Sequence, residues 1–485
     1  MNLKISAAVA AVIACSAVPA FASDLATTTG VQNGTIAGVV VNASGASAQR
    51  DAFLSFMART ICQAGSFDMY RAAPTGGQDF RAYSCRIVNN AGIYGGAANQ
   101  LAVVFYRSEG GSAWGPVPMS QRNAVAPFYT PANDIAVMRL NVDGTCTTTS
   151  TASVGTVNYT VHDCPLPTND YQLASDTSAS ADANLTLDTV DLGVADEEPK
   201  MFTGVNFPTV STRLTAIPSG SRDSNLGQLN NIAQVGFGQL FGVVVNNTTG
   251  PLAGAPNATR RNIGKNVVAG IFNGTYTDWS QVISGDGTLV NPGGQQIKVC
   301  RREPGSGTQV AAHQYFLGTP GCKPQFPNGT FVTDGADADN TNLAADTDGV
   351  IERGTSADLA TCVGTLPGAI GIVVGNAAPA NTVFLNLDGR VPDRNLAAVG
   401  GYDYWFEQTF TINPRLGAGA VQDLAQALID EAKLSGSAPN VASVISLPND
   451  NNDPLGQGAF VAGTPPISFG TRGGNSCTPI VPIAP

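Results

Sequence analysis

The chain has little charge of either sign, and positive charge is the scarcer. Of its 485 residues only 13% are charged, and 25 basic residues face 36 acidic ones, giving a formal net charge of −11. Only six of the basic residues are lysines. Surfaces that bind nucleic acid or anionic lipid need clustered Lys and Arg. The composition therefore excludes nucleic acid as a partner, and a small anion would have to be held by local geometry.

Histidine and long apolar segments are also scarce. The only histidines are His162 and His313, and no Cys-x-x-Cys motif occurs, so a zinc site has little to build with. We predict no metal and no cofactor. Beyond the first 22 residues, no run of the roughly 18 apolar residues that a membrane-spanning helix needs occurs. No membrane insertion is therefore predicted. A hydrophobic content of 43% excludes wholesale disorder, and the length favours two lobes or domains.

The N-terminus predicts export. Lys4 precedes an apolar run, and Ala20-Phe21-Ala22 supplies a small-x-small cleavage pattern, so residues 1–22 are predicted to be a signal peptide. An alternative interpretation makes Cys15 the acylated first residue of a lipoprotein. The apolar stretch before Cys15 is short, and a soluble periplasmic or secreted protein is therefore favoured.

Eight of the nine cysteines lie beyond the signal peptide. An even number of cysteines in an exported chain predicts disulfides. Short loops favour the pairs Cys62–Cys85 and Cys146–Cys164, and the sequence leaves the other pairings open.

A recurring strand–loop–helix pattern predicts an α/β fold. Residues 38–42 form a β-branched run, followed by a loop of small residues and then by helical apolar spacing over residues 49–62. A second strand is predicted at residues 101–106. A third, at residues 297–300, leads through a Gly-rich loop into a predicted helix at residues 309–317. Such repeated units are typical of mostly parallel sheets flanked by helices.

Two stretches depart from this pattern. Residues 121–187 are rich in Thr, Ser, Asp and Asn and are interpreted as an inserted β-rich excursion or surface flap. Residues 334–348 contain five Asp, but the stretch lacks the Gly at the sixth position and the closing Glu that an EF-hand needs. A solvated acidic loop is therefore favoured over a calcium site. Further on, apolar spacing over residues 421–432 predicts an amphipathic helix.

The most informative motif runs from Arg302 to Thr308, Arg-Glu-Pro-Gly-Ser-Gly-Thr. Gly307 lets the backbone approach a ligand closely, and Ser306 and Thr308 offer hydroxyl groups. A helix that begins here directs free N–H groups and its positive end at the same point. Arg302 adds a two-pronged donor suited to an oxyanion. An ordinary Ser N-cap beside a surface Arg remains the alternative.

Two further serines and one aspartate complete the candidate site. Ser47 and Ser112 each follow a predicted strand in a loop of small residues, where a plain helix cap is the alternative role. Asp196 lies in an acidic stretch, which could simply mark the first turn of a helix. If it faces an anion, like-charge repulsion disfavours the contact unless the ligand carries a proton, so this position would favour a protonated anion over sulfate.

At this point the sequence resembles the periplasmic phosphate-binding proteins of ABC transporters, in the type II periplasmic-binding superfamily. Five landmarks carry the resemblance in the family's order: Ala43-Ser44-Gly45-Ala46-Ser47 for its Gly-Ala-Gly-Ala-Thr loop, Asp191–Asp196 for its Asp-Phe-Gly-Ala-Ser-Asp segment, Ile271–Trp279 for Ile-Phe-x-Gly-x-x-x-x-Trp, Arg302–Thr308 for Arg-x-x-Gly-Ser-Gly-Thr, and Gly368–Gly371 for the Ala-Ile-Gly-Tyr turn.

The resemblance implies a two-lobed Venus-flytrap fold that binds phosphate, or a similar oxyanion, in the cleft between its lobes. Lobe one would comprise residues 36–243, with the insertion, and the return segment 404–485. Lobe two would comprise residues 244–403. The ligand-binding residues it implies are Ser47, Ser112, Asp196, Arg302, Ser306, Gly307 and Thr308. The implied partner is an ABC permease.

The sequence also departs from the family. The family's Gly-Ser-Ser-Gly-Gly loop is replaced by Gly111-Ser112-Ala113-Trp114-Gly115, and Pro304 stands where some members have Asp. The insertion and the disulfides are similar to DING-type relatives, which makes a secreted phosphatase the first alternative function. A surface or biofilm protein that retains the fold without a ligand is the second. No Gly-x-Ser-x-Gly elbow occurs, so no catalytic residue is assigned and a non-enzymatic role is favoured.

Overall fold

A computed structural model of the chain describes residues 24–73, 79–120, 135–165, 185–208, 219–318, 329–333, 349–375, 377–433, 444–445, 447 and 468–482. The predicted signal peptide and the acidic stretch 334–348 lie outside these residues.

Helices and strands alternate along much of the described chain, as the sequence pattern predicts. The helices are α1 (Leu25–Gln32), α2 (Arg50–Phe56), α3 (Ala91–Tyr94), α5 (Ser219–Asn230), α6 (Lys265–Phe272), α7 (Gly307–Leu317), α8 (Ser356–Thr365), α9 (Arg394–Ala398) and α10 (Ala420–Lys433). Short 3₁₀ turns include η1 (Ser47–Gln49), η4 (Ser112–Trp114), η5 (Val117–Met119) and η6 (Pro199–Met201). The strands are β1 (Val39–Gly45), β2 (Asp68–Ala73), β3 (Phe80–Arg86), β4 (Leu101–Arg107), β5 (Val137–Leu140), β6 (Thr147–Val154), β7 (Val157–Pro165), β8 (Leu185–Asp188), β9 (Leu192–Ala195), β10 (Gln234–Asn246), β11 (Asn262–Ile263), β12 (Lys298–Arg302), β13 (Val350–Arg353), β14 (Ala369–Val374), β15 (Thr382–Phe384), β16 (Asn386–Leu387), β17 (Trp405–Ile412), β18 (Val444–Ile445), β19 (Gly470–Thr471) and β20 (Val481–Pro482).

The strands form a large mixed sheet in an α/β fold. Its main path runs β13-β12-β14-β10-β17-β9-β1-β4-β3-β2-β7-β6, with β15 and β18 also paired to β10. The expectation of mostly parallel sheets is wrong for the described residues, because hairpins such as β2–β3 and β6–β7 add antiparallel pairs. Parallel pairing is kept where β1 meets β4 and β9, and where β12 meets β13 and β14.

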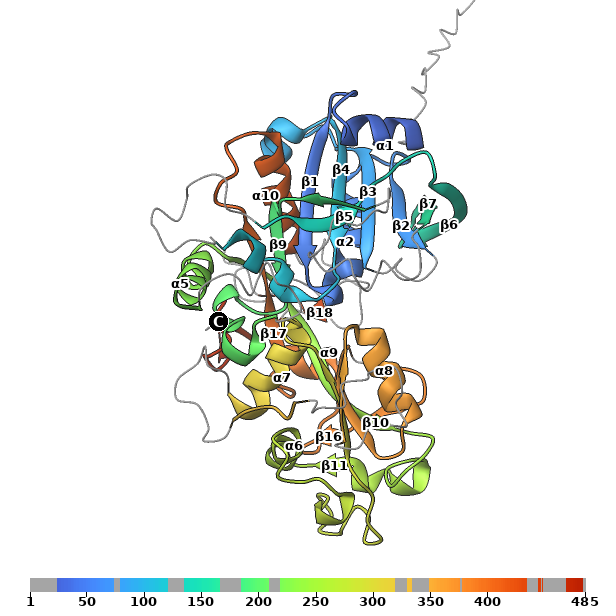
Figure 1. The fold of residues 1–485 in the computed structure, drawn as a ribbon, viewed down its shortest axis with the longest axis vertical. Helices are drawn as coiled ribbons and strands as arrows, with labels where there is room; N and C mark the ends of the chain where they lie inside the picture. The colour runs from blue at the N-terminus through green and yellow to red at the C-terminus, as the bar shows by residue number, and fades with distance from the viewer. Residues whose placement is uncertain are drawn as a thin grey trace, which may run out of the picture.

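Two bodies of the molecule share this sheet, and β10 and β17 run between them (Figure 1). The first part of β10 pairs with β17, whereas Phe241–Val245 pairs with β14. Separate buried cores lie on either side of this crossing. One contains Phe53, Phe56 and Leu428, and the other contains Phe272, Trp279 and Phe316. The described residues thus form two lobes that share one sheet, as expected from the sequence.

The insertion is β-rich where it is described. Strands β5 and β8 pair with each other, and the hairpin β6–β7 extends the main sheet through β2. The disulfide Cys146–Cys164 closes this hairpin and Cys62–Cys85 lies in the same lobe, so both predicted pairs are confirmed. A third disulfide, Cys300–Cys362, joins β12 to α8, a pairing that loop length alone did not suggest.

The predicted amphipathic helix is α10, which buries Leu424, Leu428 and Ile429 against β10 and β17. None of the helices in the described ranges is both long and apolar enough to cross a membrane.

Candidate functional site

Three parallel strands of the first lobe end at one edge of the sheet, and their following loops meet there. Gly45, at the end of β1, pairs with Val194 of β9, and Ser44 pairs with Arg107 at the end of β4. Gly45 has φ +137°, and the next N–H, of Ala46, donates to the carbonyl of Val194 at 2.8 Å. Loops that follow the carboxyl ends of adjacent parallel strands are where ligands bind in open α/β sheets.

The second lobe contributes the turn between β12 and α7. Gly305 takes a positive φ of +95°, which turns the chain sharply before α7 begins at Gly307. Its carbonyl accepts the N–H of Ala113 at 2.9 Å, so the two lobes touch at this point. The first N–H groups of α7 have no acceptor within the helix, and they lie at the positive end of the helix dipole.

Gly307 faces the predicted site residues of the first lobe directly. A Cβ added at Gly307 would lie 2.6 Å from Oδ2 of Asp196 and would also collide with the hydroxyl of Ser112. The N–H of Asp196 donates to Oγ of Ser112 at 3.2 Å. The structure therefore brings Ser112, Asp196 and Gly307 together from three distant segments.

Asp196 is buried, and one of its carboxyl oxygens is unpartnered. The side chain is 2% exposed, and in the described part of the chain Oδ1 has no hydrogen-bond partner. Burial raises the pKa of Asp196 to about 7, against the lowering effects of the Ser112 hydroxyl and the positive charge of Arg302. The acidic stretch does not open a full helix, since only the turn η6 follows it. A helix-capping role for Asp196 is thus not seen.

Arg302 is buried, and most of its guanidinium faces the second lobe. It donates to the carbonyls of Arg353 at 3.1 Å and Gly354 at 2.6 Å, and to Oγ of Ser356 at 2.8 Å. These bonds use three of the five N–H donors of an arginine. Burial lowers the pKa of Arg302, while Glu303 and Asp196 are among the carboxylates that raise it. Arg302 therefore anchors the loop before α8 and remains electrostatically coupled to Asp196.

The remaining predicted residues lie at the start of α7 and in the two 3₁₀ turns η1 and η4. Ser306 is 1% exposed and occupies the N-cap position of α7, but its side chain makes no capping hydrogen bond, so the plain N-cap alternative is not what the structure shows. Thr308 is buried in the first turn of α7. Ser47 begins η1 and is half-buried. Ser112 begins the 3₁₀ turn η4, and this short turn stands where the sequence pattern predicted a helix.

Two polar residues near this edge were not assigned a role from the sequence. Ser44, beside Ser47 in the same loop motif, is buried with an unpartnered Oγ in the described structure. Arg107, at the end of β4, is 1% exposed; its guanidinium lies over the ring of Trp114 and bonds Glu109 at 3.0 Å, while Nε and Nη1 have no partner among the described residues. The sequence pattern could have indicated both residues, because each lies where a predicted strand ends and a loop of small residues begins.

Both histidines are engaged elsewhere. Nδ1 of His313 lies 3.2 Å from Oδ1 of Asn206, Nε2 contacts the carbonyl of Gly329, and burial lowers the pKa of the ring. His162 stacks on Tyr70 with ring centroids 4.4 Å apart. Among the described residues no group of three or more His, Cys, Asp or Glu side chains is arranged to hold a metal ion.

Comparison with solved structures gives matches of low sequence identity. An ABC-type phosphate transport receptor from Vibrio cholerae is 15% identical over 40% of this chain, with a TM-score of 0.27, and 65% of that protein is covered, just under two thirds. A phosphate-binding protein from Stenotrophomonas maltophilia is 14% identical, with a TM-score of 0.32, over 77% of this chain and 78% of its own. The periplasmic phosphate-binding protein PfluDING, bound with phosphate at pH 8.5, is 10% identical, with a TM-score of 0.42, over 83% and 89%.

All three of these proteins are described as phosphate-binding or phosphate transport proteins. The similarity concerns the fold. No family model matches the chain, and none of the curated proteins does.

Proposed function

We propose that the chain is an exported solute-binding protein that captures inorganic phosphate, or a similar oxyanion, between its two lobes. In this proposal residues 36–243 and 404–485 form one lobe, residues 244–403 form the other, and the mature protein is periplasmic or secreted. Delivery of the ligand to an ABC permease belongs to the proposal. The observation that carries it is buried Asp196, whose Oδ1 has no partner among the described residues and whose Oδ2 faces the first turn of α7.

The geometry suits a small protonated oxyanion. N–H groups at the start of α7, the hydroxyls of Ser306 and Thr308, and the guanidinium of Arg302 would donate to the oxygens that carry charge. Ser47 and Ser112 would complete the set from the first lobe. Oδ1 of Asp196 would accept the one hydrogen bond that the ligand donates through its P–O–H group.

Asp196 would also set the specificity. An acceptor beside an anion is unfavourable unless the ligand supplies a proton between the two oxygens. Above the raised pKa of Asp196, about 7, the carboxyl group is ionised. Sulfate carries no proton there, so it would leave Asp196 facing a second negative oxygen. Binding, rather than hydrolysis, is the role we assign, because the described residues beside Asp196 do not include either histidine as a base.

The proposal is tested by titration calorimetry of the mature protein with phosphate and with sulfate. We expect phosphate to bind and sulfate to bind far more weakly. Asp196→Asn replaces an acceptor oxygen by an N–H donor, so it should weaken phosphate binding and strengthen sulfate binding. Asp430→Asn, on the exposed face of α10, is the matched control and should change neither. Absence of phosphate binding by the wild-type protein would overturn the proposal.

A further inference from the structure

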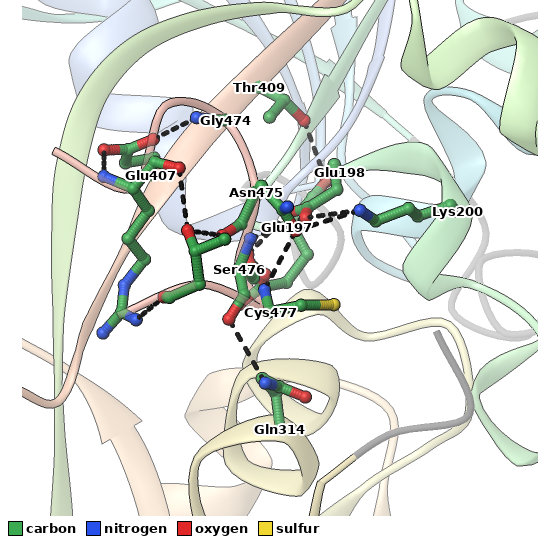
Figure 2. Close-up of polar contacts among 12 residues, drawn as sticks. Glu197, Glu198, Lys200, Gln314, Glu407, Thr409, Gly474, Asn475, Ser476 and Cys477 are labelled. Carbon is green, nitrogen blue, oxygen red and sulfur yellow. Dashed lines mark hydrogen bonds and ion pairs between the residues drawn. The ribbon is translucent and has the colours of Figure 1, made fainter. Parts of the chain in front are cut away.

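The segment 468–482, here called the C-terminal strap, packs against the residues that follow Asp196 (Figure 2). Ser476 of the strap is 3% exposed. Its hydroxyl contacts the carboxyl groups of Glu197 and Glu198, and its N–H donates to Oε1 of Glu198 at 2.6 Å. The two residues directly after Asp196 are thus both held by one serine.

The same serine also contacts the helix that carries the other half of the site. The carbonyl of Ser476 accepts a hydrogen bond from Nε2 of Gln314 at 3.2 Å (Figure 2). Gln314 lies on α7, about two turns beyond Gly307. Ser476 therefore links the Asp196 segment of one lobe to α7 of the other, about two helical turns from the contact between Asp196 and Gly307.

The strap is itself anchored firmly. Glu407, on β17, accepts the N–H groups of Arg472 and Gly474, each at 2.5 Å. Lys200 donates to Oδ1 of Asn475 at 3.0 Å, and Cys477 is disulfide-bonded. A segment with this many attachments can transmit a constraint between the elements that it touches.

The bond between Ser476 and the two glutamates is an unusual use of a single hydroxyl. A serine has one O–H donor, so it cannot donate to Glu197 and Glu198 at once when both are ionised. Burial raises the pKa of both carboxyl groups, which is consistent with one of them donating its proton to Oγ. Arg472 faces Glu197 and Lys200 faces Glu198. Ser476 is thus the residue that contacts both glutamates of this cluster.

We propose that Ser476 is a positioning residue, which fixes the Asp196 segment and α7 in the relative placement that ligand binding needs. This inference rests on the proposed function for its consequence, the capture of phosphate. The bridge itself is a property of the ligand-free chain, so it can be tested without any ligand.

Hydrogen–deuterium exchange of the full mature protein, without phosphate, tests the bridge. Ser476→Ala removes the shared hydroxyl, and Gln314→Leu removes the donor to the carbonyl of Ser476. Each should raise exchange in peptides covering both residues 196–202 and residues 307–317. Thr478→Ala is the control, because among the described residues the Thr478 hydroxyl bonds carbonyls of the strap itself, those of Arg472 and Asn475. Exchange that rises only within the strap, with both site peptides unchanged, would overturn the inference.

Phosphate binding by the same variants tests the consequence. Ser476→Ala should weaken binding about tenfold, the loss expected for one hydrogen bond to a charged group, through faster dissociation at an unchanged association rate. Both substitutions interrupt the same bridge. The double variant Ser476→Ala/Gln314→Leu should therefore lose less binding free energy for phosphate than the sum of the losses in the two single variants. A wild-type protein that binds no phosphate would overturn the proposed function, and the exchange data would still decide the bridge. Normal phosphate binding by both single variants would overturn the positioning role.

Discussion

Asp196 and Glu198 are two residues apart and both are buried, yet their carboxyl groups differ in their hydrogen-bond partners. Glu198 accepts the N–H of Ser476, contacts the Ser476 hydroxyl and lies 3.6 Å from Nζ of Lys200. Asp196 keeps Oδ1 without a partner in the described structure, while its Oδ2 faces Gly307 at the start of α7. One acid is satisfied by the protein, whereas the other is directed at the place where two lobes meet.

The difference teaches where to look for a ligand among buried acids. An unpartnered buried acceptor is destabilising, so a carboxyl oxygen left unpartnered where two lobes meet points to a group that comes from outside. Burial alone does not distinguish the two residues, since it raises the pKa of both. The hydrogen-bond partners do.

Removing Arg302, whose positive charge lowers the pKa of Asp196, should have the largest effect. Arg302→Met would leave the carbonyls of Arg353 and Gly354 and the hydroxyl of Ser356 without their donor. We expect a loss of about 3–5 kcal/mol in unfolding free energy, as for breaking a buried charged interaction from one side, and loss of phosphate binding. Urea unfolding and calorimetry measure the two. Arg390→Met, at an exposed position, should change neither, and a stable Arg302→Met protein with normal affinity would separate Arg302 from the site.

The raised pKa of Asp196 predicts a pH-dependent gain of stability in Asp196→Asn. The folded-state pKa is about 7, against 3.8 for an unperturbed Asp, so burial of the acid costs nothing below pH 3.8. The cost grows as pH rises toward 7 and then stays constant. A shift of this size corresponds to at most about 4 kcal/mol. Ligand-free Asp196→Asn should therefore match wild type near pH 3.5 and exceed it by up to that amount at pH 8.

Chemical unfolding across pH measures this difference. Asp191, whose pKa burial also raises to about 6, titrates in both proteins, so its contribution cancels from the comparison. A difference in unfolding free energy that stays constant from pH 3.5 to pH 8 would show that the pKa of Asp196 is not raised in the folded protein.

Closing the space between the lobes should have a smaller and more selective effect. In Gly307→Ala the new Cβ would lie 2.6 Å from Oδ2 of Asp196, so α7 and the Asp196 segment must move apart. Ala is favoured over Gly in a helix by about 1 kcal/mol, which offsets part of the overpacking cost of about 1–3 kcal/mol, so the net loss of stability should be small. Phosphate affinity should fall about tenfold, which is about 1.4 kcal/mol, because α7 is displaced from Asp196. Gly227→Ala, where an added Cβ meets nothing within 4 Å, is the control, and equal losses of affinity in both would contradict a specific contact.

Much of the fold could be predicted because it depends on local patterns. The β-branched run that became β1, the apolar spacing of α10 and the small-residue loop before α7 are each contained in a short window. The contact of Ser112, Asp196 and Gly307 was reached through the resemblance of motifs to a family. Spacing alone could not have placed these residues together, because each lies on a different segment.

The parts that were missed depend on distant pairing. The bond between Cys300 and Cys362 requires knowing that α8 packs on β12. The bonds of Arg302 to Gly354 and Ser356 require β13 to lie beside β12. Ser476 was not singled out, because nothing in its local sequence indicates that Glu197, Glu198 and Gln314 surround it.

The smallest effect is expected at Glu198, where the same acid-to-amide change is made as at Asp196. In Glu198→Gln the amide oxygen can still accept the N–H of Ser476, and the amide nitrogen can donate to the Ser476 hydroxyl. Stability should change by no more than about 1 kcal/mol, the size of one ordinary hydrogen bond, and the preference for phosphate over sulfate should be unchanged. Unfolding and competition titrations beside Asp196→Asn check this. If Glu198→Gln instead shifts the selectivity toward sulfate as much as Asp196→Asn does, then the acidic segment acts through its summed charge, and the unpartnered oxygen of Asp196 is not what distinguishes the ligands.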